Sequence, residues 1–359
     1  MTVIHNPSTL TTANLRREIA ADIDARLNLA ANEASTGKKA DPFRDLGSGS
    51  VEILSLRSGS IRLDGFMTSN ELLGNRLEVM ANTLTESRET LQGFLEAGVS
   101  FSETQQPIGS VLQESARAAY AQLATLVNTP YQGAQLFAGT ENTGPTLQRF
   151  DEQNAGTGLS PEDVMAGIVG AGITDAADAA AKAADVATVF DSANTVAPDT
   201  NFEATFFNGT PLEAAPGVPS PRQTALIDNG MMVEYGIQAN DPAFRTALQG
   251  LASIAAVDPS TITVPGAYEA WVGTAMAAVG DGLQMLEAAE TRLGGEQALL
   301  SQTVENQQVR ATLYERQLGV LEGVDPYEAA NRVTLLSTQL EATYAINARL
   351  SRLTFLSFM

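Results

Sequence analysis

Residues 283–321 read LQMLEAAETRLGGEQALLSQTVENQQVRATLYERQLGVL, and this stretch decides the fold. Apolar residues recur in it at alternating intervals of three and four, which is the heptad pattern of a helix that packs lengthwise on another helix. The seam positions are Leu283, Leu286, Glu290, Leu293, Gln297, Leu300, Val304, Gln307, Ala311, Tyr314, Leu318 and Leu321. Nine of these twelve are apolar, so the sequence predicts a long helix that needs an equally long partner.

A matching pattern occurs early in the chain. Its positions are Leu56, Gly59, Leu63, Phe66, Asn70, Leu73, Leu77, Met80, Leu84, Ser87, Leu91 and Phe94. The two stretches have the same length, and at about 1.5 Å per residue each helix would be roughly 57 Å long. Equal lengths, one early and one late, predict an antiparallel pair whose internal seam includes Leu63, Leu73, Leu77, Leu84, Leu91, Leu286, Leu293, Leu300, Val304 and Leu318. Polar seam residues such as Asn70 and Glu290 are expected to fix the register at some cost in stability.

The two chain ends form shorter amphipathic helices, expected at about residues 9–34 and 326–358. Pro326 suits the first position of a helix behind an Asp325 cap. Such a pair buries little apolar surface alone, so we expect it to be disordered in the monomer and to become ordered when neighbouring subunits cover it. The expected assembly residues are Leu15, Ile19, Ile23, Leu27, Leu336, Leu340, Tyr344, Leu350, Leu353, Phe355, Leu356 and Phe358.

The middle of the chain differs from both ends in composition and in hydrophobic pattern. Glycine and proline become frequent between residues 142 and 265, and the heptads disappear. We expect helices at 174–190 and 241–256 and strands at 201–207 and 231–237. The predicted fold is mainly α: a long antiparallel coiled-coil bundle formed by both chain ends, with an inserted α+β domain at its distal end. The predicted domains are a terminal helix pair (1–45 and 323–359), a rod (46–141 and 266–322) and the insertion (142–265).

Composition excludes several classes of function. The 359 residues include 21 basic and 42 acidic side chains, and a net charge of −21 disfavours nucleic-acid binding. With no cysteine and only His5 as histidine, thiol, Ser-His-Asp and multi-histidine metal chemistry are disfavoured. We therefore expect no enzyme activity and no cofactor. No apolar run is long enough for membrane insertion, and the first residues lack the pattern of a cleaved signal peptide.

Local motifs add no chemistry. The glycine-rich run at 167–172 lacks the spacing of a dinucleotide or phosphate loop. Asp22 and Asp24 lack the glycine and distal glutamate of a calcium loop, and a solvated helix face is the better interpretation. Asn208-Gly209-Thr210 matches a glycosylation sequon, a triplet that is common by chance.

Four stretches resemble the flagellin-like axial proteins of bacteria. Residues 33–39 (EASTGKK) are similar to the family's Leu-Ser-Thr-Gly segment, and residues 128–140 (NTPYQGAQLFAGT) to its Asn…Gly-x-Tyr-Leu-Phe-x-Gly-Thr signature. Residues 229–244 carry a third likeness. The ending at 339–356 is more similar to that of family members that join hook to filament than to that of flagellin.

The resemblance implies a structural role. The chain ends would line a tube, the rods would form the next layer, and the insertion would lie outside. The implied partners are the first hook-associated protein, flagellin, further copies of the chain in a ring or tube, and an export chaperone. The implied location is the extracellular flagellum, reached by type III export without a cleaved signal peptide. Flagellin itself is the first alternative, and an enzyme or adhesin on a coiled-coil stalk, active in residues 142–265, is the second.

Overall fold

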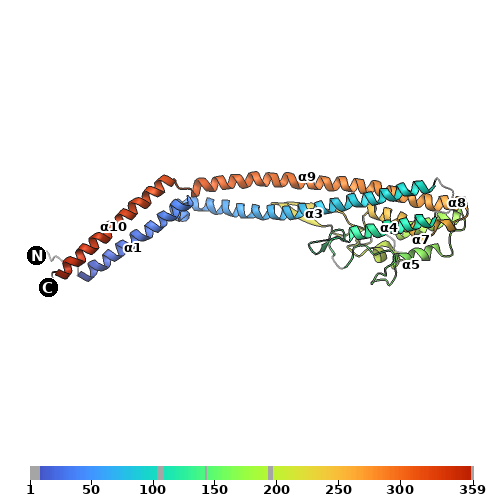
Figure 1. The fold of residues 1–359 in the computed structure, drawn as a ribbon, viewed down its shortest axis with the longest axis horizontal. Coiled ribbons are helices and arrows are strands. Elements are labelled where there is room, and N and C mark those ends of the chain that lie inside the picture. Colours follow the sequence, from blue (N-terminus) through green and yellow to red (C-terminus); the bar gives the residue numbers. More distant parts are fainter. Residues whose placement is uncertain (1–8, 103–108, 142–143, 193–196, 357–359) are drawn as a thin grey trace. The chain divides into compact units, whose positions relative to one another are not determined.

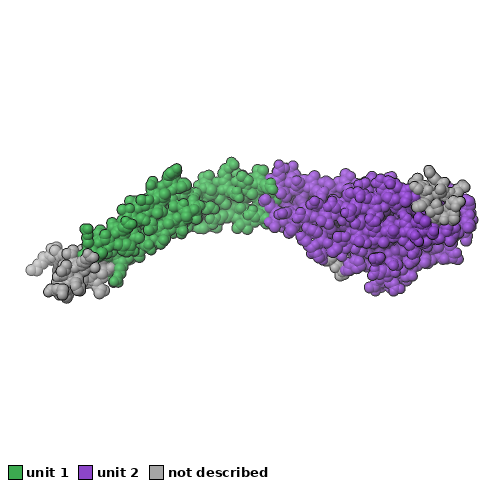
Figure 2. Space-filling model, in the orientation of Figure 1, with its two compact units in different colours: residues 1–65, 306–359 green, residues 66–305 purple. Residues whose placement is uncertain are grey.

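The computed structural model describes residues 9–102, 109–141, 144–192 and 197–356. Its contacts divide the chain into two compact units, which are coloured separately in Figure 2. Unit 1 comprises residues 1–65 and 306–359, and unit 2 comprises residues 66–305. Two long helices, α3 (Ser50–Ser102) and α9 (Thr274–Glu322), contribute residues to both units. The predicted fold class, a helical bundle with a small strand-containing part, is confirmed.

Unit 1 is built almost entirely from helices. Helix α1 (Thr9–Thr36) packs along α10 (Pro326–Leu356), as Figure 1 shows. Helix α1 ends at Gly37, whose positive φ of 67° suits a glycine, and the short helix α2 (Pro42–Leu46) follows behind an Asp41 cap. The Asp325 side chain accepts a hydrogen bond from the Tyr327 amide, and this cap starts α10.

Contacts between α3 and α9 follow an antiparallel register within each unit. In unit 1, a Cβ on Gly59 would lie 3.3 Å from the Tyr314 ring. In unit 2, Gly74 faces Leu300, and the Thr85 hydroxyl donates to the Glu290 carboxylate at 2.6 Å. Residues later in α3 thus contact residues earlier in α9, as expected for antiparallel helices. Gly59 thus occupies a position where the two helices approach closely.

The seam residues differ in burial along the two helices. The structure buries Leu63, Leu77, Leu84, Leu91, Leu286, Leu293 and Leu300, whereas Leu73, Val304 and Leu318 are half-buried. Asn70 is also buried, and its amide donates to the Ile227 carbonyl at 2.8 Å. This bond holds a neighbouring strand, and the expectation that Asn70 sets the register between the long helices stays a prediction.

Unit 2 surrounds its part of the long helices with short elements. Helix α4 (Gly109–Val127) packs on α7 (Pro242–Ala256), and α7 also contacts α5 (Pro161–Val169) and α6 (Ala176–Val189). Helix α8 (Pro265–Tyr268) and a π-helical turn (Glu269–Gly273) lead into α9. The strands form three two-stranded antiparallel pairs: β1 (Pro130–Tyr131) with β2 (Ala134–Gln135), β3 (Glu213–Ala215) with β4 (Val218–Pro219), and β5 (Thr224–Asp228) with β6 (Met231–Glu234).

One hydrophobic core runs through unit 2 and joins seam residues to the predicted insertion. Leu84 and Leu91 of α3, Leu286 of α9, and Phe244 and Trp271 all belong to it. The boundary between the compact units falls after residues 65 and 305, and the predicted limits of the insertion at 142 and 265 stay a prediction. The seam of two helices leaves apolar surface uncovered, and the inserted elements cover part of it.

The predicted strand at 201–207 is wrong. Residues Phe202–Phe206 form a π-helical turn, capped by Asn201, whose side chain accepts from the Ala204 amide at 2.8 Å. This turn places the rings of Phe202 and Phe206 together against Phe190, with centroid separations of 5.3 and 5.0 Å from that ring. In an extended segment these two residues would lie on one face but about 13 Å apart, at roughly 3.3 Å per residue, too far for both rings to contact Phe190. The aromatic core therefore decides the local structure.

Candidate assembly surfaces

A polar junction in unit 1 ties both ends of the chain together. The Lys39 amide donates to the Glu322 carbonyl at 2.8 Å, and the Val324 amide donates to the Gly37 carbonyl at 3.0 Å. The Lys39 ammonium adds a bond to the Leu321 carbonyl at 3.1 Å. The segment after α1 thus pairs with the segment between α9 and α10. This is the segment that resembles the family's Ser-Thr-Gly motif, and its role here is to close the base of the terminal helix pair.

Two buried carboxylates complete this junction. Glu33 accepts from the Ala40 amide at 3.2 Å and from the Arg332 guanidinium at 3.0 Å, and its side chain is 9% exposed. Glu322 accepts from Arg57 at 2.8 Å. Both pairs link residues that are more than 200 positions apart, and sequence reasoning missed them. No periodic pattern signals a single charged residue that pairs across the fold.

The predicted assembly residues of α1 fall into two groups. Ile23 is buried, and Leu27 is half-buried, so both contribute to packing within the single chain. Leu15 and Ile19 are 56% and 47% exposed. Only the second group is available to a neighbouring subunit without rearrangement of the pair.

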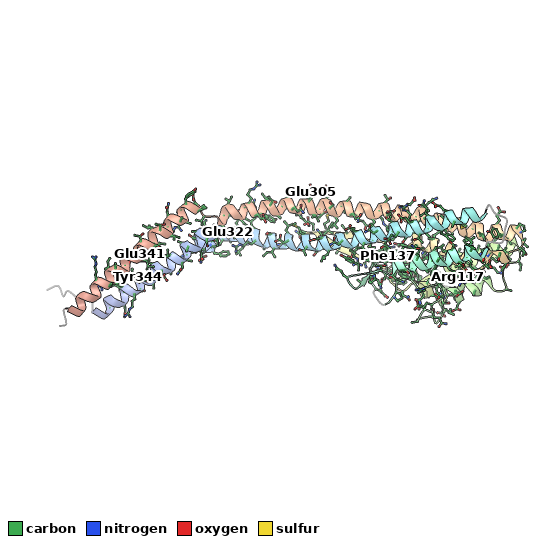
Figure 3. All side chains as sticks on the ribbon, viewed as in Figure 1. Arg117, Phe137, Glu305, Glu322, Glu341 and Tyr344 are labelled. Carbon is green, nitrogen blue, oxygen red and sulfur yellow. The ribbon has the colours of Figure 1, made fainter. Side chains whose placement is uncertain are left out.

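Helix α10 shows the same division. Leu336 and Leu340 are half-buried, whereas Tyr344 is exposed on the helix surface (Figure 3). The backbone of Leu350, Leu353, Phe355 and Leu356 is helical, but their side chains lie outside the described part of the structure, as does all of Phe358.

Further exposed apolar residues enlarge this surface beyond the predicted set. Leu29, Leu335 and Ile346 are exposed on α1 and α10. A shallow groove between the two helices is lined by Arg16, Ile19, Thr343, Ile346 and Asn347. Leu29, Leu335 and Ile346 lie beside the predicted stripes, whereas Ile19 belongs to the predicted set. A search of the sequence for large apolar residues outside the main stripe of each helix would have found Leu29, Leu335 and Ile346.

The signature at residues 128–140 is a packing motif. Leu136, Phe137 (labelled in Figure 3) and Ala138 are buried. The Phe137 ring packs edge-on against Phe244, with the ring centroids 5.9 Å apart. Gly139 has a φ of 75°, and a Cβ there would lie 2.7 Å from the Gln238 side chain. The Ala239 amide donates to the Phe137 carbonyl at 2.9 Å, so the second and third family-like stretches meet in the core of unit 2.

Metal-binding clusters and shifted pKa values bear on the chemistry open to the described residues. No cluster of three or more potential metal-binding side chains is present in that part of the chain. Burial raises the pKa of Tyr120, whose hydroxyl donates to the Gln148 carbonyl at 3.3 Å. Burial also lowers the pKa of Arg245, which donates to the Phe190 carbonyl at 2.7 Å. Both shifts belong to groups that hold the core together rather than to groups in an open cleft.

The side chains of the predicted glycosylation sequon make hydrogen bonds within the chain. The Asn208 amide donates to the Pro145 carbonyl at 3.1 Å, and the Thr210 hydroxyl is buried and receives the Thr140 amide at 2.8 Å. Neither side chain is free for modification. Among the described residues, no helix combines the length and the apolar character needed to cross a membrane.

Comparison with known proteins finds one family model and a solved structure to which parts of this chain are similar. Residues 276–359 match the model of the bacterial flagellin C-terminal helical region. The sequence matches no curated protein. A solved structure from Vibrio parahaemolyticus, described as a flagellar hook-associated protein, has a similar fold, with a TM-score of 0.50 and 12% identity. That match covers 77% of this chain and 99% of the other.

Proposed function

We propose that this flagellin-like chain is a structural subunit of the bacterial flagellum that joins the hook to the flagellin filament. The observation that carries the proposal is the pair of long antiparallel helices with a separate terminal helix pair, together with the flagellin C-terminal match over residues 276–359. A structural subunit needs surfaces that bind other subunits and no catalytic group. The exposed apolar residues of α1 and α10 supply such surfaces.

The proposed partners follow from this role. On the hook side the chain binds the first hook-associated protein, on the filament side it binds flagellin, and laterally it binds its own copies in a ring or tube. An export chaperone binds it before assembly, and it reaches the extracellular flagellum by type III export without a cleaved signal peptide. It has no enzyme activity. The fold match to a hook-associated protein supports this placement.

Flagellin, the bulk subunit of the filament, is the second candidate, and the family match favours it as much as it favours a junction protein. Self-polymerisation discriminates between the two. Purified flagellin extends filaments from seeds, whereas a junction protein alone forms no long filaments. Growth of long filaments by this chain alone would select the second candidate.

The decisive experiment is electron microscopy of flagella from a strain that lacks this chain. We expect hooks without filaments, with flagellin shed into the medium. Complementation with the wild-type chain restores filaments, and complementation with Tyr344→Asp does not, because a charge at this exposed apolar position opposes subunit contact. Retained filaments in the deletion strain would contradict the junction role. Loss of flagellin from cells and medium alike would indicate that the chain is flagellin.

A further inference from the structure

The dipeptide Asn-Gly occurs twice in the chain, at Asn208-Gly209 and at Asn229-Gly230. Because glycine has no Cβ, its amide nitrogen can approach the side-chain carbonyl carbon of the preceding asparagine with little steric hindrance. Attack on that carbon closes a succinimide ring and releases ammonia, and asparagine counts among the thermolabile residues of proteins. The two dipeptides are alike in sequence, but the structure holds them in very different ways.

The side chain of Asn208 is held at both ends of its carboxamide. The carboxamide nitrogen donates to the Pro145 carbonyl at 3.1 Å and to the Gln148 side-chain oxygen at 3.2 Å. The carboxamide oxygen accepts from the Asn154 side-chain nitrogen at 2.8 Å. Turning the carboxamide carbon towards the next backbone nitrogen would break these bonds, so cyclisation at Asn208 first requires a local opening of unit 2.

The backbone around Asn208 is constrained as well. The Asn208 amide donates to the Thr146 carbonyl at 2.9 Å, and two residues later the Thr210 amide donates to the Ala138 carbonyl at 2.8 Å. A Cβ on Gly209 would lie 2.5 Å from the same Ala138 oxygen, so glycine is needed here for a close approach of two backbone segments. The first Asn-Gly dipeptide is therefore part of the packed interior of unit 2.

Asn229 and Gly230 form the exposed turn between β5 and β6. The strand register pairs Asp228 with Met231, so these two residues make the whole connection. Gly230 has a φ of 74°, and a Cβ there would meet no atom within 4 Å. The Asn229 backbone amide donates to the Asp228 side chain at 2.7 Å, but in the described part of the chain no group forms a hydrogen bond with the Asn229 carboxamide. This side chain can therefore turn towards the next amide without an opening of the fold.

We propose that Asn229 is a site of spontaneous deamidation, which converts it to a mixture of aspartate and isoaspartate. The Gly230 amide nitrogen loses its proton and forms a bond to the carboxamide carbon of Asn229, while the bond from that carbon to the side-chain nitrogen breaks and ammonia leaves with the proton. Water then adds to one of the two carbonyls of the succinimide. Opening on the side-chain nitrogen bond's former carbon leaves aspartate or isoaspartate according to which ring bond is cleaved. The reaction needs water and no oxidant, cofactor or enzyme.

Both products change the turn and leave the rest of the hairpin anchored. The new carboxylate follows directly after Asp228, so two negative charges then stand side by side at the turn. Isoaspartate also adds a methylene group to the main chain of a connection whose length fixes the pairing of Asp228 with Met231. The buried Asn70 amide donates to the Ile227 carbonyl at 2.8 Å and holds β5 independently of the turn. We therefore expect faster hydrogen exchange at the turn and none of this change in the core of unit 2.

The test is incubation of the purified full-length chain at mildly alkaline pH, both native and in concentrated urea, followed by peptide mass spectrometry. Replacement of an amide NH2 by OH locates the reaction by mass, and chromatography separates the aspartate from the isoaspartate peptide. In the native chain we expect Asn229 to react on the order of a hundredfold faster than Asn208, which reacts only from a locally open state. In urea the two rates should converge, because only the shared dipeptide remains.

Each outcome decides the proposal. Equal native rates at Asn208 and Asn229, or an Asn229 that reacts in urea but not in the native chain, overturn it. A difference that persists undiminished in urea would assign the contrast to the flanking sequence and would overturn the structural argument. The control Asn229→Ser keeps a turn-forming residue but removes the carboxamide, so the peptide that contains it should show no change of mass. The measurement uses the chain alone and does not depend on its role in an assembly.

Discussion

Units 1 and 2 are built from the same two long helices, yet they bury very different amounts of apolar surface. The continuous core of large side chains belongs to unit 2, where Phe137, Phe244 and Trp271 are essentially inaccessible. Among the described residues of unit 1, the buried apolar side chains are Ala20, Ile23, Ala30, Ile53, Leu63 and Ala329. Most of these are small or isolated, so unit 1 gains little from the hydrophobic effect within one chain.

This difference suggests separate roles for the two units: unit 2 supplies most of the stability, and unit 1 supplies the surfaces for assembly. Unit 2 has the larger core, so we expect it to fold without a partner. Unit 1 is closed by a polar junction and carries exposed apolar residues on α1 and α10, which would suit contacts with neighbours in the proposed assembly. Substitutions in the two units should therefore fail in different ways: by unfolding in unit 2 and by loss of assembly in unit 1.

The largest effect is expected for Leu300→Asp in unit 2. Leu300 is buried opposite Gly74, and an aspartate there would place a charge in an apolar seam. We expect the free energy of unfolding of unit 2 to fall by about 4 kcal/mol or more. Urea unfolding followed by the fluorescence of Trp271, which is buried in unit 2, measures it.

The matched variant in unit 1 is Tyr344→Asp. Tyr344 is 56% exposed, so the urea midpoint should stay within experimental error of the wild type while assembly is lost. Equal destabilisation by the two substitutions would break the proposed division between the units.

Hydrogen exchange should reveal the same contrast without mutation. We expect residues 1–35 and 326–359 to exchange rapidly in the monomer and to become protected at least a hundredfold on assembly, or roughly 3 kcal/mol. The core of unit 2 should be protected in both states. Equal protection of the terminal helices in monomer and assembly would show that unit 1 is stable alone.

A smaller effect is expected at the polar junction. Glu33→Ala removes the acceptor of the Ala40 amide and of the Arg332 guanidinium, and we expect a loss of about 1–2 kcal/mol, confined to unit 1. Exchange rates of α1 and α10 peptides in the assembled state, where these helices are expected to be protected, report it. The exposed Glu341 of α10 provides the control, since Glu341→Ala should change those rates little (Figure 3). A loss in unit 2 of the same size would contradict the local role of Glu33.

Periodicity explains why the long helices could be predicted. A heptad pattern repeats a local rule many times, so single polar interruptions at Glu290 or Gln307 do not hide it. The fold class and the antiparallel pairing followed from it, although α3 and α9 extend beyond the predicted seams by up to nine residues. The caps at Gly37 and Asp325 were equally local, and both lie where the sequence indicated.

Features that depend on distant residues could not be predicted in this way. Glu33 and Arg332 meet only because the ends of the chain are brought together, and Phe202 and Phe206 become helical because Phe190 lies beside them. The exposed apolar residues Val51 of α3 and Val320 of α9 were overlooked for another reason. A search that follows only the most apolar stripe of a helix treats all residues outside that stripe as solvent-facing, including apolar ones.

The smallest effect is a pH-dependent one at Glu296 of unit 2. Its carboxylate accepts the Gly236 amide at 2.9 Å, at the end of the segment that follows β6. Burial raises the pKa of Glu296, and the nearby Glu234 adds to this, while the Gly236 hydrogen bond and Arg292 oppose it. A folded-state pKa above the unfolded value means that ionisation costs stability. The stabilisation that the protonated Glu296 carboxyl gives to the folded state is therefore fully present below the unfolded pKa, about 4.3. It is lost as pH rises through the higher folded pKa.

Glu296→Gln tests this sign. Glutamine can still accept the Gly236 amide through its side-chain oxygen but cannot ionise, so the variant should melt at a slightly higher temperature than the wild type at neutral pH. The difference should shrink towards zero as the pH falls below about 4, because the wild-type carboxyl then becomes protonated in both states. Glu305→Gln, at an exposed position of the same helix (Figure 3), should show no such trend. If the advantage of Glu296→Gln grew on acidification, the ionised carboxylate of Glu296 would stabilise the folded state. The charge on Glu296 would then strengthen its contact with the segment after β6.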